Sequence, residues 1–159
     1  MNPAEVKETV KAVVEECLRP SEDMTLFAAQ NLAKLVHKKA KEIGVKAVIA
    51  ISNKGAHPVL VECADDSLIA SYDIAVNKAY TVVALKMSTK ELAELAKPDG
   101  SLYGIQFTND NKIVVFGGGE PLTNKNGKII GGVGISGGSE QQDTALAKYA
   151  KEIFEKGIN

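Results

Sequence analysis

Residues 45–63, VKAVIAISNKGAHPVLVEC, decide the fold class of this chain. Val45–Ser52 and Pro58–Cys63 are rich in aliphatic and β-branched residues, and the turn Asn53–Gly55 lies between them. Two such runs joined by a short turn that contains glycine are typical of an antiparallel β-hairpin. Parallel strands would need a helical crossover instead, so this segment favours an antiparallel sheet.

Helical patterns flank the hairpin. Leu26–Ile43 has an apolar face, Thr25 as its N-cap and Gly44 as its stop. Ser88 and Ser139 each begin a capping box. Further helices are expected over about 67–86, 88–96 and 139–156, and further strands over 105–108, 113–116 and 129–135. This order predicts an α+β sandwich in which helices flank an antiparallel five-stranded sheet.

Residues 2–19 form a separate helical pattern. Asn2 is a suitable cap, Pro3 suits the first helical position, and Glu5 completes a capping box. One narrow apolar stripe follows, formed by Val6, Val10, Val13, Val14 and Cys17. So short a helix is marginal alone and must dock its stripe somewhere. Because a polar linker follows at 19–23, we divide the chain into residues 1–22 and a domain over 23–159.

Composition excludes several classes of protein. The 159 residues carry 19 basic and 20 acidic side chains, a balance that argues against a nucleic-acid partner. No apolar run reaches the length of a membrane span, and the charged N-terminus is unlike a secretory signal. Cys17 and Cys63 are expected to be reduced thiols in a cytoplasmic protein. Arg19 is the only arginine, so an anion site elsewhere must use lysine or backbone N–H groups.

The sequence favours a binding protein over an enzyme. It contains two histidines, and no HExxH, CxxC or GxSxG spacing supports a metal centre or a catalytic triad. His37 lies on the edge of an apolar helical face, where it is either a packing residue or a ligand to a metal centre. His57 follows a turn and is expected to be exposed.

Eleven of the 14 glycines lie between residues 100 and 138. Gly132–Gly137 has the spacing G-x-G-x-x-G after a strand, but the chain ends with the helix that follows. A dinucleotide site needs a second parallel strand, so that interpretation fails. Two interpretations stay open for this turn. Either the strand and helix pack closely, or free N–H groups at the helix start bind a carboxylate or another anion.

Two further features also have alternative explanations. Gly117, Gly118 and Gly119 form either a bulge or a backbone surface that lines a flat ligand. Lys78 lies with Asp73 and Asn77 in a mostly apolar helix, where such groups usually satisfy one another or the backbone.

Four ordered segments together resemble the GlcG/HbpS family, which includes the haem-binding C-terminal domain of PduO-type corrinoid adenosyltransferases. They are SYDIAVNKAYT at 71–81, PDGSLYGI at 98–105, FGGGEPL at 116–122, and GGVGISGG at 131–138 followed by Gln142 and Asp143. The resemblance covers about residues 24–156. It implies a profilin-like sandwich that assembles into homo-oligomers, from dimers to octamers. It also implies a haem cofactor or, less often, a corrinoid such as cobalamin.

The resemblance also suggests site residues. His37 stands in the helix that carries a haem-ligating histidine in some members, so it is the candidate metal ligand. Lys78, Gly117, Gly118, Gly119, Gly137 and Gly138 are the other candidate cofactor-binding residues. With no arginine in the domain, haem propionates would have to meet lysines or backbone N–H groups.

Residues 1–20 resemble the encapsulation peptides that deliver cargo to the shell proteins of bacterial microcompartments. A helix packed on its own domain or on a neighbouring subunit is the alternative. The resulting hypothesis is that the chain is an oligomeric haem- or tetrapyrrole-binding protein. It would be cargo or an accessory protein of a bacterial microcompartment and would be located in the microcompartment lumen. The competing hypothesis is an enzyme or accessory protein that binds a small carboxylate in a glycolate- or diol-utilisation pathway.

Overall fold

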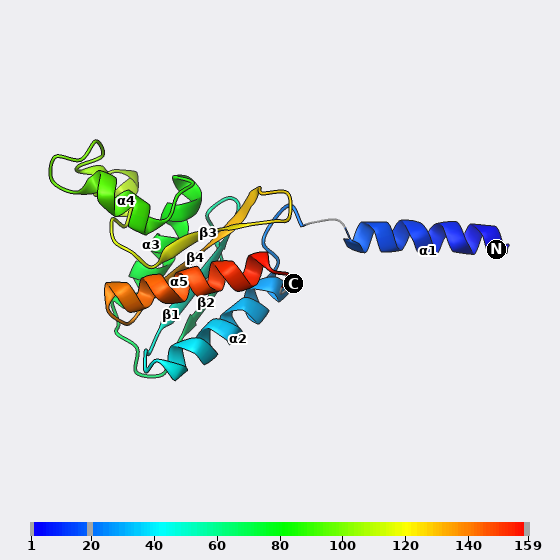
Figure 1. Ribbon diagram of the computed structural model, residues 1–159, viewed down its shortest axis with the longest axis horizontal. Coiled ribbons are helices and arrows are strands. Elements are labelled where there is room, and N and C mark those ends of the chain that lie inside the picture. Colours follow the sequence, from blue (N-terminus) through cyan, green and yellow to red (C-terminus); the bar gives the residue numbers. More distant parts are fainter. Residues whose placement is uncertain (1, 19–20, 158–159) are drawn as a thin grey trace.

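The computed structural model describes residues 2–18 and 21–157, and of residues 15–18 only the backbone. Within these residues four strands form one antiparallel sheet in the order β2-β1-β4-β3. The strands are β1 (Val48–Asn53), β2 (Pro58–Cys63), β3 (Gly119–Thr123) and β4 (Ile129–Ser136). Helices α2 (Leu26–Glu42) and α5 (Glu140–Glu155) cover one face of the sheet, and α3 (Ser71–Ala84) covers the other (Figure 1). The predicted α+β class, with helices flanking an antiparallel sheet, is confirmed.

The predicted hairpin is present as β1 and β2, with Val48 opposite Cys63. Side chains alternate along β1 because successive residues of a strand point to opposite faces. Ile49 and Ile51 join the core under α2 and α5, whereas Val48 and Ala50 pack with α3. The continuous apolar run of β1 therefore reflects a strand that is buried on both faces.

The predicted number of five strands is wrong, since the described sheet has four. The segment 105–108 is mostly a short 3-10 helix (Ile105–Phe107), and a second one follows at Asn109–Asn111. The segment 113–116 is irregular; its Val114 N–H donates to Thr81 Oγ1 at 3.0 Å instead of to a strand. The missed strand, β3, begins with Gly119 and contains Pro121, residues that disfavour a central strand. β3 is an edge strand, where proline is tolerated.

The helix starts follow the capping signals. Ser88 caps α4 (Thr89–Ala96) in a complete capping box with Glu91, and Ser139 caps α5 in a box with Gln142. The side chain of Thr25 accepts from the Ala28 N–H at the start of α2. The helix expected over 67–86 is shorter than predicted: α3 begins at Ser71 and ends at Ala84.

Helix α1 (Pro3–Leu18) stands apart from the sheet and its helices (Figure 1). Asn2 and Glu5 form the predicted capping box. The valines of the apolar stripe are exposed: Val6 41%, Val10 56%, Val13 57% and Val14 48%. The Cys17 side chain and the linker residues Arg19 and Pro20 lie outside the described residues. None of the described helices is long and apolar enough to cross a membrane.

The glycines of β4 allow α3 to pack directly on the sheet. A Cβ at Gly134 would overlap the backbone oxygen of Ala75, and one at Gly132 would meet Val82 and the backbone oxygen of Ala79. The residue between them, Val133, points to the opposite face and is buried in the core under α2 and α5. Much of the glycine-rich segment is therefore explained by close helix–sheet packing.

Replacing Gly134 by alanine should lower the free energy of unfolding by about 1–3 kcal/mol, because the added Cβ has no room against the α3 backbone. Chemical denaturation measures the change. Gly55→Ala is the matched control: its Cβ would lie 3.3 Å from the Asn53 side-chain oxygen and meet no backbone atom closely. Equal stability of the two variants would contradict the packing explanation.

Candidate functional site

Lys78 is the most buried charged residue among those described, with no exposed surface, and it lies on the face of α3 that packs on the sheet. Its Nζ donates to the Ile135 backbone oxygen at 2.7 Å and to Asp143 Oδ2 at 3.4 Å. The ammonium also lies 4.9 Å from the centre of the Phe116 ring. Burial lowers the pKa of Lys78 below its ordinary value, and the Asp143 carboxylate opposes that shift.

The charged partner of Lys78 is not the aspartate of its own helix that the sequence suggests. Asp73, five positions before Lys78 in α3, is exposed, and the carboxylate that meets the ammonium belongs to Asp143 of α5. Asp143 also accepts from the Gly138 N–H, at 2.9 Å. One buried ion pair thus joins α3, β4 and the start of α5.

Gly117, Gly118 and Gly119 are buried against their own chain. The Gly117 N–H donates to Glu140 Oε1 at 3.0 Å, and the Gly119 N–H donates to Thr89 Oγ1 at 2.9 Å. Gly118 has φ +112°, and a Cβ there would press on Lys78 Nζ. Tight packing and backbone conformation therefore account for these three glycines.

A pocket of about 300 Å³, which we call the glycine pocket, opens where α3 and α5 begin. Gly137 and Gly138 line it together with Ser71, Ser136 and Asp143. The two serine hydroxyls are hydrogen-bonded to each other at 3.0 Å. The exposed side chains of Leu68 and Phe116 add apolar surface to the lining of the glycine pocket.

The start of α5 is already capped by its own residues. Asp143 Oδ1 accepts from the Gly138 N–H, and Gln142 Oε1 accepts from the Ser139 N–H at 2.9 Å. Glu140 adds another carboxylate to the lining of the glycine pocket. These groups compete with an external anion, so the arrangement does not favour the small-carboxylate hypothesis.

His37 lies on the side of α2 that faces the hairpin. Its Nε2 is 3.2 Å from Glu62 Oε2 of β2, and its side chain is 26% exposed. The imidazole lines a depression of about 460 Å³, which we call the His37 depression, together with Val45, Ala64, Lys41 and Lys46. His57, by contrast, is exposed just before β2, as expected.

The His37 depression and the glycine pocket are neighbours. They share no lining residue, but Gly138 lies against the Val45 side chain and Gly137 against the Lys46 backbone. Val45 and Lys46 both line the His37 depression. The structure thus brings His37, Gly137 and Gly138 to one end of the sheet, whereas Lys78 and Gly117–Gly119 form the packed interior behind the glycine pocket.

The donor set at His37 fits a macrocycle-bound iron. No group of three or more His, Cys, Asp or Glu side chains suited to a bare metal ion occurs among residues 2–18 and 21–157. A haem needs one axial ligand from the protein, an apolar wall and cations for its propionates. His37, Val45 with Ala64, and Lys41 with Lys46 have these chemical properties.

Glu62, whose carboxylate contacts the His37 ring, is a site residue that the sequence does not predict. Metal-binding histidines usually donate their second nitrogen to a carboxylate or a carbonyl. Glu62 is separated from His37 by 25 positions and lies on another element, so no local pattern connects the two.

Comparison with known proteins gives a consistent result. A family model described as haem-degrading protein HbpS-like matches residues 24–152. An uncharacterised 15.0 kDa protein in the dhaT–dhaS intergenic region of Citrobacter freundii is 44% identical over 131 residues, 82% of this chain and 92% of its own length. The corrinoid adenosyltransferase PduO of Salmonella typhimurium is 32% identical over 97% of this chain but only 47% of its own length. The chain therefore spans about half of PduO.

A solved structure described as a PduOC:haem complex has the same fold. It superposes with a TM-score of 0.78 and 33% identity, over 82% of this chain and 94% of that one.

Proposed function

The chain belongs to the HbpS-like family, and from that premise we propose that it binds haem, or a closely related tetrapyrrole, as a homo-oligomer. The observation that carries the proposal is the similarity to the PduOC:haem complex over nearly the whole domain. The His37 depression adds the chemical argument, because it combines an imidazole with an apolar wall and two lysines.

His37 is the proposed axial ligand. With Nε2 next to Glu62, Nδ1 would be the nitrogen that binds the iron, and a ring flip would exchange the two roles. Glu62 would in either case orient the ring and increase its basicity as a ligand. When bound, haem supplies a redox-active iron, and the residues of this chain hold and orient it.

The lysines of the His37 depression are the proposed partners of the propionates. Lys41 is exposed, and Lys46 is 3.0 Å from the exposed Asp66, an exchangeable surface pair. Lys78 is fully buried and already paired, so its proposed role is to hold Phe116 and Asp143 behind the glycine pocket. The backbone of Gly137 and Gly138 would then form the wall of the haem site next to the His37 depression.

A second copy of the chain is the proposed cover for the open side of the ligand. Several large apolar side chains near the glycine pocket are exposed: Leu68 67%, Ile69 97%, Tyr72 49% and Phe116 41%. A contiguous group of this kind is typical of a subunit or ligand interface. We therefore propose assembly through this surface, within the range from dimer to octamer.

Titration of the purified full-length chain with hemin, and separately with cobalamin, tests the proposed function. We expect a saturable Soret shift with about one hemin per chain, and a weaker response to cobalamin. Absence of a spectral change with both ligands, together with a thermal shift on adding a small organic acid, would favour the carboxylate hypothesis instead. Because the family description mentions haem degradation, the Soret band is followed over time with added reductant; progressive bleaching would indicate an enzyme.

We further propose that residues 1–22 act as a targeting segment, separate from the domain over 23–159, and that the protein is microcompartment cargo. The exposed valine stripe of α1 supports this proposal, because an amphipathic helix with an uncovered apolar face needs a partner.

Fusing residues 1–20 to a fluorescent protein should produce foci in cells that make microcompartment shells. Val10→Glu combined with Val14→Glu should disperse them, because both changes place charge on the apolar stripe. Lys7→Glu changes charge on the polar face and is the control. Diffuse fluorescence of the unmodified fusion would exclude the targeting role.

A further inference from the structure

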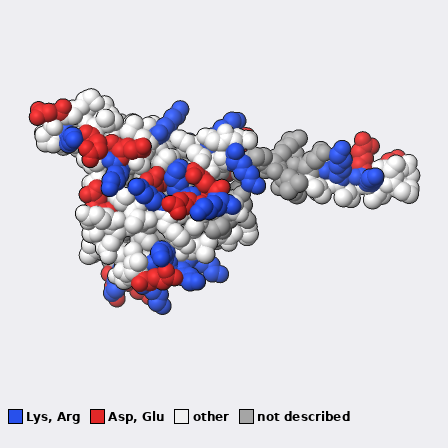
Figure 2. Space-filling view, viewed as in Figure 1, with Lys and Arg blue, Asp and Glu red and all other residues white. Residues whose placement is uncertain are grey.

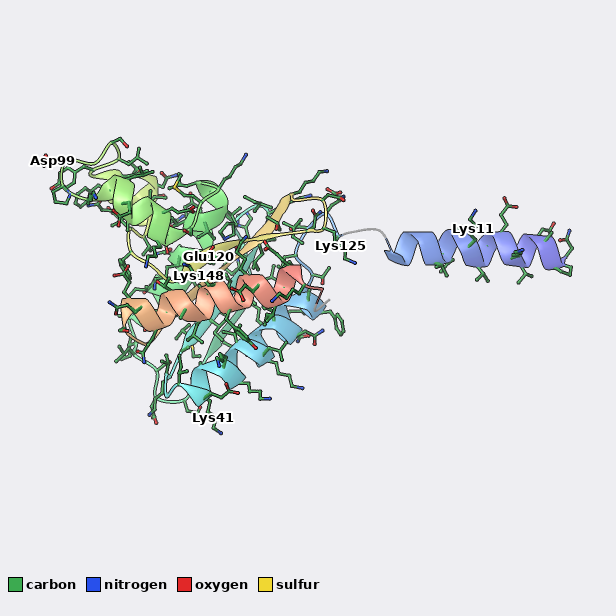
Figure 3. All side chains as sticks on the ribbon, in the orientation of Figure 1. Lys11, Lys41, Asp99, Glu120, Lys125 and Lys148 are labelled. Atoms are coloured by element: carbon green, nitrogen blue, oxygen red, sulfur yellow. The ribbon has the colours of Figure 1, made fainter. Side chains whose placement is uncertain are left out.

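A groove of about 560 Å³ lies between α4 and α5, away from the His37 depression and the glycine pocket. We call it the α4–α5 groove. It is lined by charged side chains of the two helices and by Glu120 of β3. Figure 3 shows Glu120 and Lys148 side by side where α5 crosses β3. Figure 2 shows acidic and basic side chains interspersed over this face of the molecule.

Glu120 is the unusual member of this lining. The residue is only 7% exposed, yet no hydrogen bond or ion pair reaches its carboxyl group within residues 21–157. Burial raises its pKa above the ordinary value for a glutamate, and the positive charges of Lys151 and Lys148 only partly oppose the shift. Because a carboxyl group that loses most of its solvent without gaining a protein partner is destabilising, this residue requires a separate explanation.

The neighbouring charges are mostly engaged elsewhere. Lys151 Nζ donates to the Pro121 backbone oxygen at 3.0 Å and to Glu155 at 2.7 Å. Glu91 accepts from the backbone and hydroxyl of Ser88. Among the described residues, Glu120 therefore lines the groove as a largely buried acceptor without a protein partner.

We propose that the α4–α5 groove binds the ammonium group of a small primary amine, with the Glu120 carboxylate as its counter-ion. Five carboxylates and three lysine ammonium groups line the groove, so its charge favours a cation over an anion. An ammonium group supplies both the hydrogen-bond donor and the charge that Glu120 lacks. This proposal is independent of haem binding.

Ligand-observed saturation-transfer NMR on the full chain tests the proposal, with propylamine as the probe and 1-propanol and propionate as matched ligands. Propylamine should bind, and propionate should not. Glu120→Gln keeps the shape but removes the charge, and should weaken propylamine binding by about 10-fold or more. Glu42→Gln, in an exposed ion pair on α2 that does not line the groove, is the control and should leave the affinity unchanged. Lys148→Met should preserve or increase it, because a competing ammonium group is removed.

The pH dependence of the unmodified protein gives a second test that needs no variant. Propylamine stays protonated, so its affinity should fall as the pH is lowered from neutrality towards the raised pKa of Glu120, where that carboxylate takes up a proton. The other charged groups that line the groove are Lys90, Glu91 and Glu94 of α4, and Lys148, Lys151, Glu152 and Glu155 of α5. Three results would each overturn the proposal: no binding of propylamine, equal binding to Glu120→Gln, or tighter binding of propionate.

Discussion

Replacing His37 by alanine should remove the ligand-dependent shift of the Soret band and weaken hemin binding by about 100-fold or more. The expected loss exceeds the roughly 10–100-fold that follows removal of a residue that only supports a metal ligand. Glu62→Gln should give an effect of that smaller size, because the Gln side chain can still contact the His37 ring but lacks the charge. Absorbance titration with hemin measures both variants.

His57→Ala is the matched control for this experiment. His57 is exposed on the turn before β2 and lines neither the His37 depression nor the glycine pocket. Its loss should leave the hemin titration unchanged. If His37→Ala kept the original Soret band and affinity, His37 would not be the axial ligand.

Replacing Asp143 by alanine should have the largest effect on stability, about 3–5 kcal/mol at neutral pH. The change leaves the fully buried Lys78 ammonium without its carboxylate, and it also leaves the Gly138 N–H without its acceptor. Equilibrium denaturation measures the loss.

Two controls separate this effect from the simple loss of an ion pair. Glu22→Ala removes the carboxylate of the exposed pair with Lys128 and should cost about 1 kcal/mol or less. Adding Lys78→Met to Asp143→Asn should recover stability relative to Asp143→Asn alone, because no uncompensated charge is then buried. If Asp143→Ala cost no more than Glu22→Ala, the buried pair would not stabilise the fold.

The destabilisation by Asp143→Ala should also become smaller as the pH rises. Asp143 raises the pKa of Lys78, so its removal lets burial lower that pKa further. A lysine whose pKa is lower in the folded state loses its proton in the folded state at a lower pH than in the unfolded state. The free energy of unfolding then increases with pH until the pH reaches the pKa of that lysine in the unfolded state. Denaturation at several pH values above neutrality checks the sign.

The parts of the fold that depend on local signals could be predicted from the sequence. The hairpin at 45–63 and the caps at Ser88 and Ser139 are set by residues within a few positions of one another. The predicted strands at 105–108 and 113–116 are wrong because a short apolar run does not distinguish a strand from a 3-10 helix or from irregular chain. The sequence does not predict β3 because it begins with a glycine and contains a proline, and proline is tolerated in a strand mainly at the sheet edge.

The candidate site is less predictable because its contacts are long-range. The sequence places His37 on the edge of an apolar helix face, but not its contact with Glu62. It identifies Lys78 as a buried charge, but its partner Asp143 is 65 positions away. Gly118 and Gly134 were noted as unusual, and only the packing of α3 and α5 explains them.

The most direct test of the haem proposal is a crystal structure of the full chain grown with hemin, with anomalous diffraction recorded at the iron absorption edge. We expect one iron peak per chain beside a ring nitrogen of His37, with Glu62 at the other ring nitrogen and a second copy covering the ligand. An iron peak elsewhere, for example in the glycine pocket without contact to His37, would contradict the proposed ligand. A chain that takes up no iron under saturating hemin would contradict haem binding itself.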